Sequence, residues 1–248
     1  MDIKNIVLLV IFILGLVYIQ FLQPRSVDEI INKYAEARGG REKLNSISSI
    51  YMEGLREMMA KEISIKITKV QNKLYRNDFE FSGNAGYAIV TPTEGWSFIP
   101  MSSKEAEPIA EDKLKNMQTE LDIVGPLINY IAKGHKAVFA GRENIDGKEV
   151  YKIRLTLNTG TEIICLIDTE TNLLLQTRQT NVGFDNHDND IVNSEREVIT
   201  NFGDYKPVDG VLFPHKILNP GNGLNAGLTR FNKIELNMPV DKSKYGIS

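Results

Sequence analysis

Few side chains in this sequence are suited to metal or nucleophilic chemistry, and those that are present lie far apart. The three histidines, His135, His187 and His215, form no HxxxH or HExxH pair. Zinc sites are typically built from such pairs or from several cysteines, and Cys165 is the only cysteine. It lies in the aliphatic run 163–167, where burial raises the pKa of a thiol. We therefore expect loop or strand residues rather than a zinc site or a nucleophile.

Other motifs for catalysis or ligand binding are incomplete. The acidic stretch Asp185–Asp190 lacks the turn glycine and the closing glutamate of an EF-hand, which favours a solvated loop. The sequence has no Gly-x-Ser-x-Gly elbow, and Gly221 and Gly223 do not lie between a strand and a helix as a phosphate loop requires. The sequence therefore predicts no enzyme, no metal and no cofactor, and a hydrolase is poorly supported.

Composition and charge exclude several classes of protein. Hydrophobic residues make up 42% and charged residues 25% of the 248 residues, which is typical of a globular protein. The formal net charge is −3, and no cluster of basic and aromatic residues occurs, so no nucleic-acid partner is expected. No linker divides the chain after residue 25, and we predict one domain over residues 26–248.

The first 25 residues are set apart as a targeting segment. Residues 6–22 form an uncharged apolar run that follows Lys4, at the short limit of what spans a bilayer. No Ala-x-Ala cleavage site and no lipobox cysteine follow it. A cleaved signal peptide and an uncleaved membrane anchor both remain open. Either one predicts that the domain is delivered to the periplasm or cell envelope.

The elements that must position any site begin with a helix over Ser26–Arg38. Ser26 and Glu29 form a capping box, and Gly39-Gly40 provides the stop. From residue 49 the hydrophobic period becomes two, which predicts strands over 50–57 and around Ile63, Ile65 and Ile67.

An aromatic segment over residues 73–100 follows and dominates the first half of the chain. It predicts three strands, Leu74–Phe81, Tyr87–Thr91 and Trp96–Ile99, separated by turn residues. So much apolar area must face a packed core or an apolar cavity. The apolar pattern does not separate these two alternatives.

A helical stretch over Ile109–Lys133, broken at Gly125-Pro126, interrupts the strands, and we interpret it as a lid. The second half again predicts hairpins, with a polar loop over 182–193, to give about ten or eleven strands without βαβ alternation. The expected fold is therefore mainly β with flanking helices, a single curved antiparallel sheet forming an incomplete barrel.

Several short motifs resemble, in their order along the chain, the Lol-type (LolA/LolB-like) outer-membrane lipoprotein-sorting carriers, most closely those of Bacteroidetes. The motifs are Gly39-Gly40, Leu74-Tyr75-Arg76, Glu94–Phe98 with Pro100, Lys152–Leu155, Ile167–Thr171, and Asp204-Tyr205 with Asp209–Pro214. The resemblance spans nearly everything after Val27.

This resemblance implies a half-barrel closed by helices, with a hydrophobic cavity that holds acyl chains of a lipoprotein or another lipid without catalysis. It also implies an inner-membrane donor and an outer-membrane acceptor as partners. The carriers latch their lid with an arginine, at whose place this chain has Gln71-Asn72-Lys73, so Lys73 is the nearest basic candidate.

From the faces of the predicted strands and helices, we expect two sets of residues to form the cavity. The expected lipid-binding residues are Ile63, Ile65, Ile67, Phe79, Phe81, Tyr87, Ile89, Trp96 and Phe98. The expected inner face of the lid consists of Leu114, Met117, Leu127 and Ile131. The alternative is a non-catalytic structural or interaction module of the cell envelope whose core is filled.

Overall fold

A computed structural model of the chain describes residues 26–58, 61–100, 102–185, 192–220 and 227–241. Four of the sequence predictions concern residues outside these ranges. They are the targeting segment 1–25, the loop residues 59–60, most of the acidic stretch with His187, and the glycines of the turn at 221–223.

The described residues form three α-helices, one 3₁₀ helix and a large set of strands. The helices are α2 (Val27–Ala37), α3 (Arg41–Asn45), α4 (Glu111–Met117) and the 3₁₀ helix η1 (Gln118–Leu121). The strands are β1 (Ser49–Met58), β2 (Lys61–Val70), β3 (Leu74–Phe81), β4 (Asn84–Val90), β5 (Gly95–Phe98), β6 (Glu107–Pro108), β7 (Lys136–Ile145), β8 (Lys148–Thr156), β9 (Glu162–Asp168), β10 (Leu174–Asp185), β11 (Val192–Val208), β12 (Val211–Asn219) and β13 (Gly227–Leu236).

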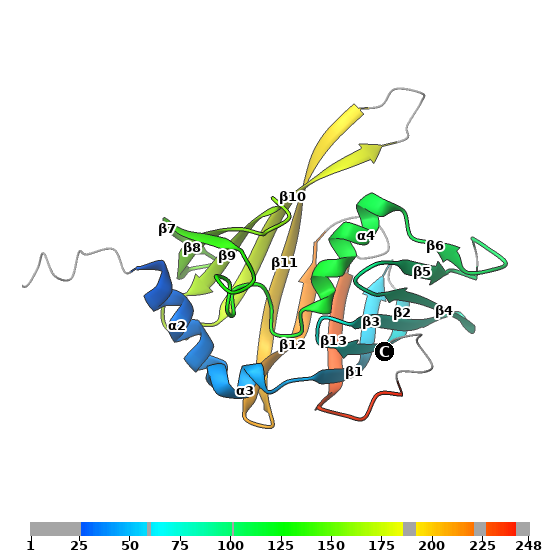
Figure 1. Cartoon of the computed structure of the whole chain (residues 1–248), viewed down its shortest axis with the longest axis horizontal. Coiled ribbons are helices and arrows are strands. Elements are labelled where there is room, and N and C mark those ends of the chain that lie inside the picture. The colour runs from blue at the N-terminus through cyan, green and yellow to red at the C-terminus, as the bar shows by residue number, and fades with distance from the viewer. Residues whose placement is uncertain (1–25, 59–60, 101, 186–191, 221–226, 242–248) are drawn as a thin grey trace, which may run out of the picture.

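All of these strands belong to one 13-stranded sheet in the order β6-β5-β4-β3-β2-β1-β13-β12-β11-β10-β9-β8-β7. Two meanders, β1–β6 and β7–β13, are joined by the antiparallel pairing of β1 with β13, where Ile50 lies opposite Leu236. The outermost strands β6 and β7 are not neighbours, so the sheet stays open (Figure 1). The predicted fold, a single antiparallel sheet with a few short helices, is confirmed.

The predicted N-terminal helix is confirmed as α2 and is capped as expected. The hydroxyl of Ser26 accepts a hydrogen bond of 3.1 Å from the backbone N–H of Glu29. The helix buries its stripe of Ile30, Ile31, Tyr34 and Ala35 and ends at the glycine pair 39–40. Gly39 has φ of 121°, and a Cβ there would lie 2.3 Å from the carbonyl oxygen of Gly210, so only glycine fits this approach to β12.

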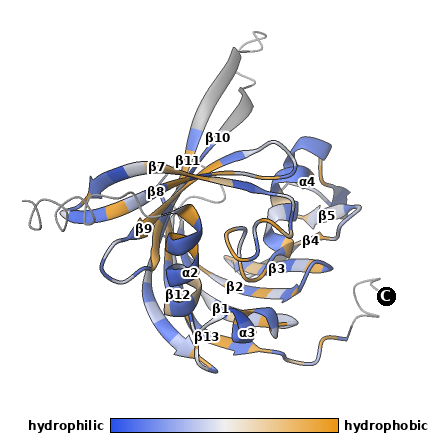
Figure 2. Cartoon of the chain, turned by 60° about the vertical axis from the view of Figure 1, so that its left-hand side comes forward, coloured by the Kyte–Doolittle hydropathy of each residue, from blue (hydrophilic) through white to orange (hydrophobic). Residues whose placement is uncertain are grey.

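Helix α2 and the inner face of the sheet share one hydrophobic core. Buried side chains from α2, β2, β8 and β9 belong to a single contiguous cluster. The alternation that places the isoleucines of β2 on one face is visible along this strand in Figure 2. Among the described residues, no helix is long and apolar enough to span a membrane.

Two boundaries differ from the sequence prediction. The second half of the predicted helical stretch is not a helix, because residues 126–134 form a series of turns. Asn129 has φ of 57°, in the left-handed region, and this conformation interrupts a right-handed helix. The polar loop predicted over 182–193 is shorter than expected, since β10 extends to Asp185 and β11 begins at Val192.

Candidate functional site

The candidate site is the inner face of the first meander together with the segment that covers it. Antiparallel pairing sets Phe79 opposite Ile65 on β2 and opposite Gly86 on β4, so these positions share one face. Ile65 is 1% exposed, and Ile63 and Ile67 are buried beside it. Phe79 and Phe81 are half-buried and pack against the same core.

The other four expected cavity residues lie on the opposite face, and this part of the prediction is wrong. Tyr87, Ile89, Trp96 and Phe98 occupy alternate positions from Gly86 and Val90, which face the core. The rings of Tyr87 and Phe98 lie 6.1 Å apart, and the guanidinium of Arg76 lies 4.6 Å from the centre of the Tyr87 ring. Trp96 is 41% exposed. These aromatic side chains therefore form an outer patch.

Glycines on β4 and β5 leave space for larger side chains on the inner face of the sheet. A Cβ on Gly86 would lie 2.4 Å from Cζ of Phe79, so the glycine provides the space that the Phe79 ring occupies. Gly95 has the same role for the covering segment, since its Cβ would lie 2.8 Å from Cδ1 of Leu114. The small residues on β4 and β5 mark the face that receives other side chains.

The covering segment, which we call the lid, comprises α4, η1 and residues 122–134. Leu114 and Met117 of α4 point to the core but are only half-buried, and α4 contains no buried residue. Further along, the lid is firmly packed, because Leu121, Val124 and Leu127 are buried.

Three of the four predicted lid residues therefore face the core, and Ile131 does not. Ile131 is 69% exposed. Its carbonyl oxygen accepts a hydrogen bond of 2.9 Å from the N–H of Gly134, which closes a turn. Because this part of the lid is a turn, the helical spacing that assigned Ile131 to the inner face does not apply.

The lid is held at its middle by Gln71 of the β2–β3 turn. Its Oε1 accepts from the N–H of Ile123 at 2.8 Å, and its Nε2 donates to Oδ1 of Asp122 at 3.1 Å. The ammonium of Lys133 donates to the other oxygen of Asp122 at 2.5 Å. Lys69 of β2 adds an ion pair of 2.6 Å with Glu120. Gln71 and Lys69 thus form a latch between the lid and the β2–β3 hairpin.

A second set of contacts holds the lid to α2. Arg38 is 5% exposed, and its NH1 donates to the carbonyl of Val124 at 2.8 Å and to the hydroxyl of Tyr34 at 3.1 Å. The hydroxyl of Tyr130 donates to Oδ1 of Asp28 at 2.6 Å. This hydrogen bond to a carboxylate, with burial second, raises the pKa of Tyr130 to about 12.

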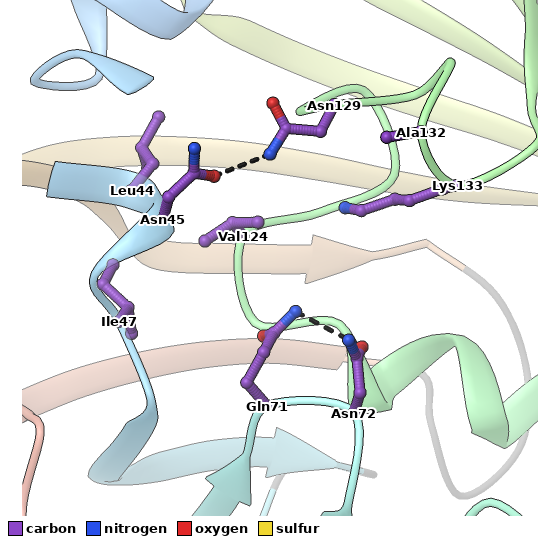
Figure 3. A pocket seen from close by; sticks show the side chains of 9 residues that line it. All are labelled: Leu44, Asn45, Ile47, Gln71, Asn72, Val124, Asn129, Ala132 and Lys133. Carbon is purple, nitrogen blue, oxygen red and sulfur yellow. Dashed lines mark hydrogen bonds between the residues drawn. The ribbon is translucent and has the colours of Figure 1, made fainter. Parts of the chain in front are cut away.

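A polar pocket of about 220 Å³ opens where the lid meets α3 and the β2–β3 turn (Figure 3). Its wall combines the apolar residues Leu44, Ile47 and Val124 with polar side chains. The polar side chains are Asn45, Gln71, Asn72, Asn129 and Lys133. Pattern analysis missed this pocket because its residues come from three separate segments.

Metal and thiol chemistry have little support among the described residues. They contain no group of three or more His, Cys, Asp or Glu side chains that could hold a metal ion. Cys165 is 1% exposed, and burial raises the pKa of its thiol to about 12, so it stays protonated and unreactive at neutral pH.

Neither models of protein families nor curated protein sequences match the chain.

Comparison with solved structures finds the same fold in other proteins. A LolA superfamily protein from Nitrosomonas europaea aligns with a TM-score of 0.57 and 13% identity, over 88% of this chain and 97% of that one. A DUF1329 family protein from Desulfovibrio piger gives a TM-score of 0.48 at 13% identity, over 90% and 98%. A putative outer membrane lipoprotein-sorting protein domain from Vibrio parahaemolyticus gives 0.43 at 12%, over 88% and 94%. At 13% identity, the first of these likenesses concerns the fold alone, and the fold is LolA-like.

Proposed function

We propose that this protein binds the acyl chains of a lipid or lipoprotein in the cell envelope, without catalysis. The chains would lie between the inner face of β2 and β3 and the lid, beside Ile63, Ile65, Ile67, Phe79 and Phe81. Each buried methylene contributes roughly 0.8 kcal/mol, so one acyl chain supplies enough free energy for non-covalent binding.

The observation that carries this proposal is the incomplete packing of α4 on the sheet. Leu114 and Met117 lie over the face that contains Phe79 and Phe81, and all four side chains are only half-buried. The sheet thus does not fully cover the apolar side of α4. We infer that the seam between α4 and the inner face of the sheet admits an alkyl chain when the lid moves.

The first test is mass spectrometry of organic extracts of the purified full chain. We expect copurified lipid at a defined ratio to protein. An extract without lipid, together with no saturable binding of a fluorescent fatty acid, would contradict the proposal.

A matched pair of variants locates the binding face. Phe79→Glu places a carboxylate in the seam, and we expect acyl-chain affinity to fall roughly tenfold or more, since an unpaired charge in an apolar site is strongly unfavourable. Phe98→Glu makes the same change on a half-buried phenylalanine of the outer face and should leave the affinity unchanged. Equal losses in both variants would assign the effect to stability and not to a binding face.

One observation favours the alternative, a structural or interaction module with a filled core. Ile65 and Val90 are completely or almost completely buried, within one contiguous hydrophobic cluster. A filled core predicts that the fatty-acid probe shows no saturable binding, and that Phe79→Glu destabilises the fold without affecting any ligand.

The location and partners are part of the proposal. The apolar run at residues 6–22 supports delivery to the periplasm or cell envelope, as a cleaved signal peptide or as a retained anchor. A lipoprotein-sorting role would add an inner-membrane donor and an outer-membrane acceptor. N-terminal sequencing of the mature protein separates cleavage from anchoring.

A further inference from the structure

The polar pocket beside the lid presents hydrogen-bond donors, and the orientation of its amides can be worked out from groups that cannot flip. The guanidinium of Arg41 only donates, and its NH1 lies 3.0 Å from Oδ1 of Asn129. The amide nitrogen of Asn129 therefore donates to Oδ1 of Asn45, at 2.6 Å. Because Oδ1 of Asn45 accepts this hydrogen bond, the orientation of the Asn45 amide is fixed, and its Nδ2 is left as a donor. Among the described residues, that Nδ2 has no protein partner.

The same reasoning applies on the other wall of the pocket. The backbone N–H of Ile123 can only donate, so the oxygen of Gln71 is the atom that accepts from it. The two N–H groups of Gln71 then go to Asp122 and to Oδ1 of Asn72, the latter at 3.3 Å. Asn72 is thereby oriented, and its Nδ2 likewise has no partner in the described part of the chain.

A third donor lies between these two walls. Lys133 belongs to the pocket wall, and its ammonium donates to Asp122 and, at 3.0 Å, to the carbonyl of Gly125. One of its three N–H groups is left to donate to another acceptor. Figure 3 shows Asn45 with Asn129 on one wall and Gln71 with Asn72 on the other. Each amide oxygen of the two walls already accepts one hydrogen bond within the protein, whereas these three N–H groups have no acceptor among the described residues. The pocket therefore offers donors to a ligand.

We propose that this pocket binds the oxygen-rich head group, a phosphate or ester, of the lipid whose chains lie under the lid. A ligand rich in acceptor oxygens matches a site in which three N–H groups lack a protein acceptor within the described ranges. Ile47 and Val124 belong both to the pocket wall and to the hydrophobic core, so the pocket borders the apolar interior. This inference rests on the proposed function, because it names the polar end of the same ligand.

The test uses ligands with one chain and opposite head groups. The full chain, kept in solution by an amphipathic polymer, is titrated with decyl phosphate, with decylammonium and with inorganic phosphate by calorimetry. We expect decyl phosphate to bind about tenfold or more tightly than decylammonium, as one or two charge-assisted hydrogen bonds would give. Equal affinities of the two alkyl ligands would overturn the inference.

The variant Asn45→Asp/Asn72→Asp replaces the free donors by acceptors while keeping Oδ1 in each internal contact. We expect the preference for decyl phosphate to be lost or reversed. The matched control is Asn32→Asp/Asn144→Asp, which adds the same charge at two side chains that accept with Oδ1 outside the pocket. An unchanged preference in the pocket variant would refute the site. Should that variant not fold, Asn45→Ala and Asn72→Ala each remove one donor group and must weaken decyl phosphate selectively.

Inorganic phosphate distinguishes the possible failures. If neither alkyl ligand binds but inorganic phosphate binds the wild-type protein and not the pocket variant, the donor site stands and the lipid function fails. If both alkyl ligands bind and the pocket variant changes nothing, lipid binding stands and the donor site fails.

Discussion

Replacing Gln71 by alanine should release the lid without unfolding the sheet. The side chain makes hydrogen bonds of 2.8, 3.1 and 3.3 Å, two of them to the lid at Ile123 and Asp122. A net contribution of about 1 kcal/mol for each of the two lid contacts makes opening easier by about 2 kcal/mol. An opening equilibrium shifted by that amount is about 30-fold more populated.

Native-state hydrogen exchange measures this opening directly. We expect the amide of Ile123 to exchange about 30-fold faster in Gln71→Ala, whereas amides of β8 and β9 keep their rates. The matched control is Gln118→Ala, whose side chain donates to the carbonyls of Thr91 and Pro92 at the other end of the lid. That variant should accelerate exchange near η1 and leave Ile123 less affected. Equal acceleration throughout the sheet, or none at Ile123, would refute the latch.

Three further predictions follow from packing and from shifted pKa values. In urea titrations, Gly54→Ala should lower the free energy of unfolding by about 2 kcal/mol or more, because a Cβ there would lie 2.2 Å from the carbonyl oxygen of Arg230. The control Gly203→Ala, where a Cβ would meet open space, should change it by less than about 0.5 kcal/mol. Cys165 should react with iodoacetamide at pH 8 only in denaturant, since burial raises its pKa to about 12, and labelling of the native protein would contradict this. Burial, and after it the charge of Lys133, lowers the pKa of His135. As the pH drops below about 6.5, the unfolded state therefore binds the proton first, and the free energy of unfolding should fall. Urea midpoints at pH 7.5 and 5.5 should show a smaller fall in His135→Asn than in the wild-type protein.

Local signals predicted the elements well, because their physical causes are local. The strand over Leu74–Phe81 has the predicted bounds, and the Ser26 cap and the Gly39-Gly40 stop both occur as expected. Turn residues and hydrophobic alternation act over a few neighbouring residues, so a single sequence is enough to recognise them.

The faces of neighbouring strands were harder to predict, because they depend on register. Grouping Tyr87 and Trp96 with Phe79 assumed that all large aromatic residues face the same way. In the structure, Phe79 lies opposite Gly86, and the large residues of β4 face outward. The signal was present in the alternation of Gly86, Ala88 and Val90 with the large side chains, since a glycine opposite a phenylalanine leaves room for the ring.

The lid shows a different limit of sequence patterns. Apolar residues at helical spacing predicted a helix after Pro126, but Asn129 adopts a left-handed conformation and its side chain bonds to Arg41 and Asn45. These partners lie more than 80 positions away in the chain. Tertiary contacts of this kind override local spacing, and for the same reason the pocket could not be found from the sequence.

The pairing of β1 with β13 has a consequence for how the chain acquires its structure. These strands lie almost 180 positions apart and are the one link between the two meanders within the described sheet, so the sheet cannot be completed before Leu236 has been synthesised. Contacts so distant in sequence close slowly. A nascent chain of this protein therefore keeps the edges of β1 and β12 unpaired until β13 has been synthesised.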